Sequence, residues 1–108
     1  MYAPAIIDAK EAERFKLGPY DARLLIDIKA QGHVRYLYVL VVIKDGKPCY
    51  YISSEVNEMA AELGGGSHFL CAFEGDRHSN YGCDDKWADL ATFKEMAIKM
   101  AKDHLTVK

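Results

Sequence analysis

The run from Tyr20 to Ser53 constrains the fold more than any other part of the sequence. Between Tyr20 and Lys29 an apolar or aromatic residue stands at every second position, and Asp45-Gly46 separates two further apolar runs. Successive side chains of a β-strand point to opposite faces, so a period of two indicates a strand with one solvated face. Asp and Gly tolerate the positive φ angles of a two-residue hairpin turn. The sequence therefore predicts three meandering strands, at Tyr20–Lys29, Val34–Lys44 and Lys47–Ser53.

The two-residue turn also predicts which residues share a face. With Lys44 opposite Lys47, Val39 lies opposite Ile52, and we expect helices to cover the face of these last two residues. The other face would then carry a broad apolar and aromatic surface, and an exposed surface of this kind is typical of a partner surface or a ligand groove. The alternative is that the N-terminal segment or a helix covers it. We interpret that surface as a homodimer interface containing Tyr36, Tyr38, Leu40 and Tyr51.

Three segments carry helix signals. Asp8-Ala9-Lys10-Glu11 has the spacing of a capping box, and Gly18-Pro19 can end the short helix that would follow. A second helix would begin at Ser53-Ser54-Glu55 and end at Gly64, with Val56, Met59, Ala60 and Leu63 on one face.

The last helix shows the clearest periodicity. Asp84, Asp85 or Asp89 can cap its start. Its apolar stripe contains Leu90, Phe93, Ala97, Met100, Ala101 and His104.

Between the second and third helices, Ser67–Phe73 alternates as a fourth strand, with Phe69, Cys71 and Phe73 on one side. The polar residues from Glu74 to Cys83 are interpreted as a loop. The predicted fold is a single α+β domain spanning residues 1–108, with the order α-β-β-β-α-β-α and helices packed on a mainly antiparallel sheet.

Composition excludes several classes of partner. The formal net charge of -2 is spread along the chain without a basic stripe, which argues against nucleic-acid binding. The apolar run Leu37–Ile43 is too short to span a bilayer, so we expect no membrane partner. The three cysteines are an odd number without a dense spacing pattern, and no secretory signal is visible, so we expect free thiols and a cytoplasmic protein.

The stretch from Gly64 to Trp87 concentrates the residues that could carry chemistry. It holds two of the four histidines and two of the three cysteines. Its polar loop mixes donors, acceptors and an aromatic ring, which suits a small polar ligand. The predicted ligand-binding residues are His68, Asp76, His78, Asn80 and Tyr81.

Two catalytic alternatives use the same stretch. His68, Cys71, His78 and Cys83 are all zinc-ligand types, but His68 and Cys71 would face opposite sides of a strand, so we expect no metal and no cofactor. Cys83 precedes the last helix, yet Asp84 and Asp85 disfavour its thiolate. The sequence favours a binding or interaction module that acts as a homodimer; the alternative is a small hydrolase, metal-dependent through His68 and His78 or thiol-dependent through Cys83.

Overall fold

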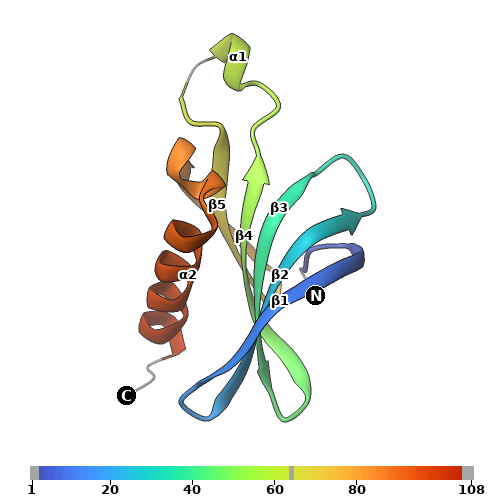
Figure 1. Cartoon of the computed structure of the whole chain (residues 1–108), viewed down its shortest axis with the longest axis vertical. Helices are drawn as coiled ribbons and strands as arrows, with labels where there is room; N and C mark the ends of the chain where they lie inside the picture. The colour runs from blue at the N-terminus through green and yellow to red at the C-terminus, as the bar shows by residue number, and fades with distance from the viewer. Residues whose placement is uncertain (1–2, 64, 106–108) are drawn as a thin grey trace.

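The computed structural model describes residues 3–63 and 65–105. Within them, six strands form one antiparallel sheet in the order β1-β2-β3-β4-β5-β6, accompanied by short helical turns and one long C-terminal helix (Figure 1). The strands are β1 (Ile6–Leu17), β2 (Tyr20–Ala30), β3 (Tyr36–Lys44), β4 (Lys47–Val56), β5 (His68–Glu74) and β6 (Arg77–Asp84). The helices are α1 (Ala60–Leu63), the 3-10 turn η1 (Asp85–Ala88) and α2 (Leu90–Leu105).

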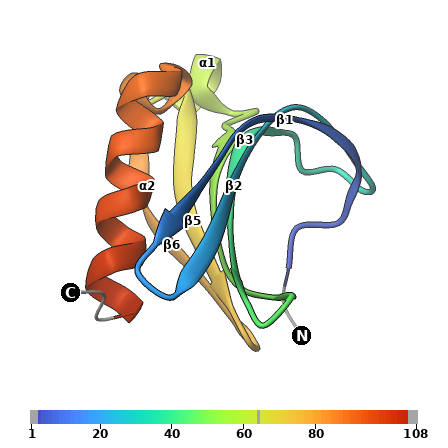
Figure 2. The ribbon, with the colours of Figure 1, turned by 60° about the horizontal axis from the view of Figure 1, so that its bottom comes forward.

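Helix α2 covers one face of the sheet (Figures 1 and 2). Its buried residues Phe93, Ala97 and Ala101 recur every four positions, which places them on the side of the helix that meets the sheet. Asp89 caps the helix by accepting the Thr92 N–H at 2.9 Å. The predicted last helix and its apolar stripe are thus confirmed. The core under α2 contains Leu17, Ala22, Leu24, Leu40, Val42, Tyr50, Ile52, Leu70, Ala72, Trp87 and the three helix residues.

The opposite face, here called the distal face, carries Val39, Val41 and Ile43 in a second buried cluster. Figure 2 shows the segment that precedes β1 and the start of β1 curving around this side of the sheet, away from α2, whereas the end of β1 reaches the side of α2. Pro4 in that segment is buried, and the Ala5 carbonyl accepts the Gln31 N–H at 2.9 Å. The N-terminal segment therefore covers part of the distal face.

The first predicted helix is wrong, because residues 6–17 form β1. Gly18, with a φ of 59°, and Pro19 form the turn into β2, instead of ending a helix. A helix of about ten residues is marginal by itself in water, whereas a strand beside β2 gains a ladder of backbone hydrogen bonds. The charged residues of β1 suit an edge strand, and Lys16 pairs with Asp21 across the turn at 2.5 Å.

The second predicted helix is also mostly wrong. Strand β4 continues to Val56, and among the described residues of this region only those of α1 are helical. The side chains that would have capped the helix bond within β4 and to η1: Ser53 Oγ donates to Glu55 Oε2 at 2.6 Å, and Ser54 Oγ donates to the Trp87 carbonyl at 2.7 Å. The helix end predicted at Gly64 lies outside the described residues.

The predicted polar loop is a sixth strand. Gly75, with a φ of 56°, and Asp76 turn the chain from β5 into β6, and Glu74 lies opposite Arg77. An edge strand can be polar, since one of its edges and part of its faces meet solvent. The predicted order α-β-β-β-α-β-α is therefore wrong in helix count and order, while an α+β fold with a mainly antiparallel sheet is confirmed.

A one-residue slip in the hairpin of β3 and β4 changes which of their side chains share a face. Lys44 lies opposite Lys47 as predicted, but an irregularity beyond Ile43 and Pro48 places Leu40, not Val39, opposite Ile52. Proline cannot donate to the ladder, and a bulge beside it moves every following side chain to the other face. Tyr38 and Leu40 consequently lie in the core under α2, and Tyr36 and Tyr51 lie on the distal face. The four residues of the predicted dimer interface do not share a surface.

Among residues 3–63 and 65–105, no helix combines the length and the apolar character needed to cross a lipid bilayer.

Candidate functional site

The two histidines of the predicted ligand site lie on opposite faces of the sheet. His68 alternates with Leu70 and Ala72 of the core under α2, and its Nδ1 lies 2.7 Å from Ser67 Oγ. Burial lowers the pKa of His68, while nearby Asp85 acts in the opposite direction. His78 lies opposite Phe73 and stacks on its ring, with 4.5 Å between centroids. The two imidazoles therefore cannot share one ligand or one metal ion.

The other three predicted ligand residues also separate. Asp76 lies in the hairpin turn, and Asn80, opposite Cys71, uses its Oδ1 to accept the Gly82 N–H at 2.8 Å. Tyr81 lines a small cavity with Tyr50 and His104 on the side of α2. Of the five predicted residues, the structure brings His78 and Asn80 to one face, and both belong to β6.

A different group of residues converges on the distal face. Glu55 of β4, Cys71 of β5 and His78 of β6 have their reactive side-chain atoms within 4.8 Å of one another. Glu55 is 7% exposed and Cys71 is 1% exposed. The strand pairing brings these residues to one face. Cys71 lies opposite Ser53, which is two residues before Glu55 in β4. His78 lies opposite Phe73, which is two residues after Cys71 in β5. We call Glu55, Cys71 and His78 the three-strand cluster.

Direct contacts hold the three-strand cluster in place. Ser53 donates its hydroxyl hydrogen to Glu55 at 2.6 Å, and His78 Nε2 lies 3.6 Å from Glu55 Oε2. Behind His78, the ring of Phe73 is contacted edge-on by Tyr36 and Tyr51, at centroid distances of 6.4 and 6.5 Å. These packed aromatic rings limit the orientations that the imidazole can adopt.

The surroundings of the Cys71 thiol disfavour its thiolate form. Burial raises its pKa well above the usual range, and the adjacent Glu55 carboxyl, which accepts a hydrogen bond from the thiol, raises it further. Nucleophilic cysteines need the opposite environment, with a nearby cation or helix N-terminus that stabilises the thiolate. The Cys83 thiol, in turn, donates to the Gly66 carbonyl at 2.7 Å.

A groove of about 550 Å³ opens beside the three-strand cluster, and Glu55 forms part of its wall. Apolar side chains from four segments line most of it: Val34, Val56, Met59 and Phe69. At its mouth, Arg35 and Glu58 form a two-pronged ion pair with distances of 2.7 and 3.0 Å, and Arg35 holds the pKa of the Glu58 carboxyl below its usual range. The groove thus combines an apolar wall with one buried carboxyl group.

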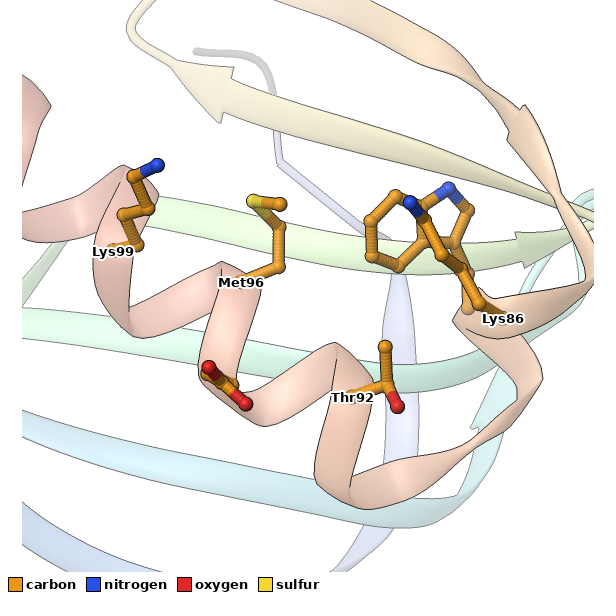
Figure 3. A pocket seen from close by; sticks show the side chains of 6 residues that line it. Lys86, Thr92, Met96 and Lys99 are labelled. Carbon is orange, nitrogen blue, oxygen red and sulfur yellow. The ribbon is translucent and has the colours of Figure 1, made fainter.

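A second cavity, of about 360 Å³, lies between η1 and α2. Figure 3 shows Thr92, Met96 and Lys99 projecting from successive turns of the helix, with Lys86 at the other end. The Lys86 ammonium lies 4.8 Å from the centre of the Trp87 ring. The polar side chains of this cavity are exposed or half-buried, so they can reorient and are less able than Glu55 to fix a ligand.

The sequence prediction missed Glu55, Cys71 and the groove residue Phe69 as site residues. A signal for Glu55 exists, since Tyr51, Ser53 and Glu55 continue the period of two beyond the predicted end of the strand. The cap-like chemistry of Ser53-Ser54-Glu55 predicted a helix start instead. The pairing of β6 with β5, which completes the cluster, also has a local signal in the two-residue turn Gly75-Asp76, but the polar residues that follow it predicted a loop instead.

Comparison of the chain with protein-family models, with curated proteins and with solved structures finds no significant match.

Proposed function

We propose that this domain is a binding module for a small molecule that has an apolar body and a cationic or hydrogen-bond-donating head. The observation that carries the proposal is that Glu55, a residue only 7% exposed, lines a groove that is otherwise largely apolar. Small-molecule sites in proteins occupy roughly 300–1,000 Å³ and combine apolar walls with a few placed polar groups. The groove has both properties.

The geometry also weighs against the hydrolase alternatives. A metal held by both His68 and His78 would need ligands from both sides of the sheet. The Cys83 S–H donates a hydrogen bond to a backbone carbonyl, and burial and the adjacent Glu55 raise the pKa of the Cys71 thiol. Binding is therefore the function that this face supports best.

The binding proposal predicts that Glu55→Gln weakens the binding of apolar amines about 10- to 100-fold, since hydrogen bonds to charged groups contribute about 1.5–3 kcal/mol. Calorimetric titration with a set of apolar primary amines, and with the alcohols of the same shape, measures this effect. The matched control is Glu95→Gln, the same change in the cavity between η1 and α2, which should leave binding unchanged.

A blocking variant tests the location separately. Val34 is 44% exposed, so Val34→Trp should fill the groove without disturbing the core. We expect this variant to bind none of the amines. Amine binding that survives both Glu55→Gln and Val34→Trp would place the ligand elsewhere and reject the proposal for this groove.

Homodimer formation is a separate proposal, and its surface must differ from the predicted one because Tyr38 and Leu40 pack under α2. What supports it is β6, which stands last in the strand order and is exposed along most of its length. Such an edge can pair with the same strand of a second copy. Light scattering over a concentration series should give twice the monomer mass, and the monomer mass at every concentration would reject self-association.

A further inference from the structure

We propose that Glu55, Cys71 and His78 bind one zinc ion on the distal face. This inference goes beyond the proposed binding of an organic molecule, because it concerns a metal and does not depend on that molecule. Zinc in proteins is bound by thiolate, imidazole and carboxylate groups, and the three-strand cluster supplies one of each.

The distances fit a tetrahedral site. The ligand atoms of the three side chains all lie within 4.8 Å of one another. Zinc bonds of about 2.0–2.2 Å to nitrogen and oxygen place two such ligand atoms about 3.3–3.5 Å apart. His78 Nε2 and Glu55 Oε2 are 3.6 Å apart, so only small side-chain adjustments are needed to enclose an ion.

The charges also fit. Zinc binding releases the Cys71 thiol proton to solvent. The Cys71 thiolate and the Glu55 carboxylate then supply two negative charges and His78 binds as a neutral imidazole, so a divalent ion makes the site neutral. Buried charges in proteins are paired or coordinate metals. In the structure, Ser53 and Cys71 hold the Glu55 carboxyl group by donating hydrogen bonds to it.

The surroundings of the cluster provide the support that metal sites need. Ser53 fixes one oxygen of Glu55 by its hydrogen bond, and Phe73 fixes the plane of the His78 ring by stacking. Groups that orient the ligands in this way commonly raise metal affinity about 10- to 100-fold. All three ligands also lie on adjacent strands of one sheet, which is a rigid frame.

Three protein ligands leave the fourth position of a tetrahedral zinc ion for water or for a bound molecule. Glu55 belongs both to the cluster and to the wall of the groove. The zinc site and the groove therefore share the Glu55 side chain.

Cobalt titration of metal-free protein tests the site. Co²⁺ occupies zinc sites and reports its ligands, because tetrahedral coordination gives intense visible bands and a thiolate ligand adds a charge-transfer band in the near ultraviolet. We expect one equivalent of Co²⁺ per chain, both signals, and their loss when Zn²⁺ is added. Cys71→Ser should remove the charge-transfer band, and His78→Gln should lower Zn²⁺ affinity by at least about 10- to 100-fold.

Cys83→Ser and His68→Gln are the controls, because they remove the same side-chain types outside the cluster; both should bind one equivalent with unchanged spectra. Thermal melts of the metal-free variants establish that each one folds, and the partly exposed His78, with 34% of its side chain accessible, provides the variant with the smallest folding risk.

Absence of saturable binding, or spectra unchanged by Cys71→Ser and affinity unchanged by His78→Gln, would overturn the zinc site. Metal binding without amine binding would support the zinc site and reject the proposed organic ligand. Amine binding without metal binding would support the organic ligand and reject the zinc site.

Discussion

Replacing Phe93 by alanine is expected to lower the free energy of unfolding by about 3–5 kcal/mol, the usual cost of removing a buried phenylalanine ring. Phe93 is 0% exposed and its ring centroid lies 5.6 Å from that of Tyr38. It is the largest buried side chain that α2 inserts into the sheet. Domains of this size are stable by only about 5–15 kcal/mol, so the loss would be a large fraction of the total.

Urea denaturation followed by circular dichroism measures this change. The matched control is Glu95→Ala on the exposed side of the same helix, which should change stability by no more than about 0.5 kcal/mol. A loss of less than about 1 kcal/mol for Phe93→Ala would mean that the helix does not pack on the sheet through this ring.

The parts of the fold that could be predicted from the sequence are those in which one buried face imposes a clear period. The period of two in Tyr20–Lys29 and the Asp45-Gly46 turn predicted β2, β3 and β4 correctly, apart from their ends. Phe93, Ala97 and Ala101 likewise revealed α2 and the side that it buries. These patterns persist because burying apolar side chains stabilises the fold wherever they occur.

The edge strands could not be predicted in this way. Strands β1 and β6 carry mostly exposed side chains, so their pattern reports little burial. Local signals then pointed elsewhere: Asp8-Ala9-Lys10-Glu11 resembles a helix cap, and the polar run before Asp84 resembles a loop. Backbone pairing with β2 and β5 decides both cases, through hairpins closed by the turns Gly18-Pro19 and Gly75-Asp76, and tertiary pairing of this kind overrides local propensity.

Irregularities in the strands explain the errors in face assignment. The slip beyond Ile43 moved Tyr38 and Leu40 to the side of α2. In β2, Asp27 has a φ of 49°, and Leu25 and Ile28 both contact the distal cluster although a strict alternation would separate them. A period of two cannot reveal an extra residue in a strand.

The candidate site was predicted only in part, for the same reasons. The alternation of Ser67–Phe73 correctly placed Cys71 and Phe73 on the side away from Leu70. The partners of Cys71 come from the unpredicted end of β4 and from the unpredicted strand β6, so Glu55 and His78 could not be joined to it. His78 was identified as a site residue from its polar neighbours, although the structure surrounds it with aromatic rings and a buried carboxyl group.

Gly66 fixes the end of the sheet where the groove opens. Its carbonyl accepts hydrogen bonds from Asn57 Nδ2 at 3.0 Å and from the Cys83 thiol at 2.7 Å, and both of these side chains also line the groove. A Cβ atom at Gly66 would overlap the backbone of Asp84. Because backbone atoms cannot rotate away as a flexible side chain can, an alanine here would force the segment after α1 away from β6.

Gly66→Ala is therefore expected to lower the free energy of unfolding by about 2–3 kcal/mol, in the upper part of the range for overpacked sites, and to weaken binding in the groove. Gly65→Ala is the matched control, since a Cβ there meets open space and only the φ of 83° is unfavourable, at a cost of about 1–2 kcal/mol. Urea denaturation of both variants separates the steric effect from the backbone effect. If Gly66→Ala proved no more destabilising than Gly65→Ala, the close contact between Gly66 and β6 would be disproved. A Gly66→Ala variant that is less stable but binds amines normally would show that the groove does not depend on this contact. In that case the hydrogen bonds of Asn57 and Cys83 to the Gly66 carbonyl would have adjusted without changing the site.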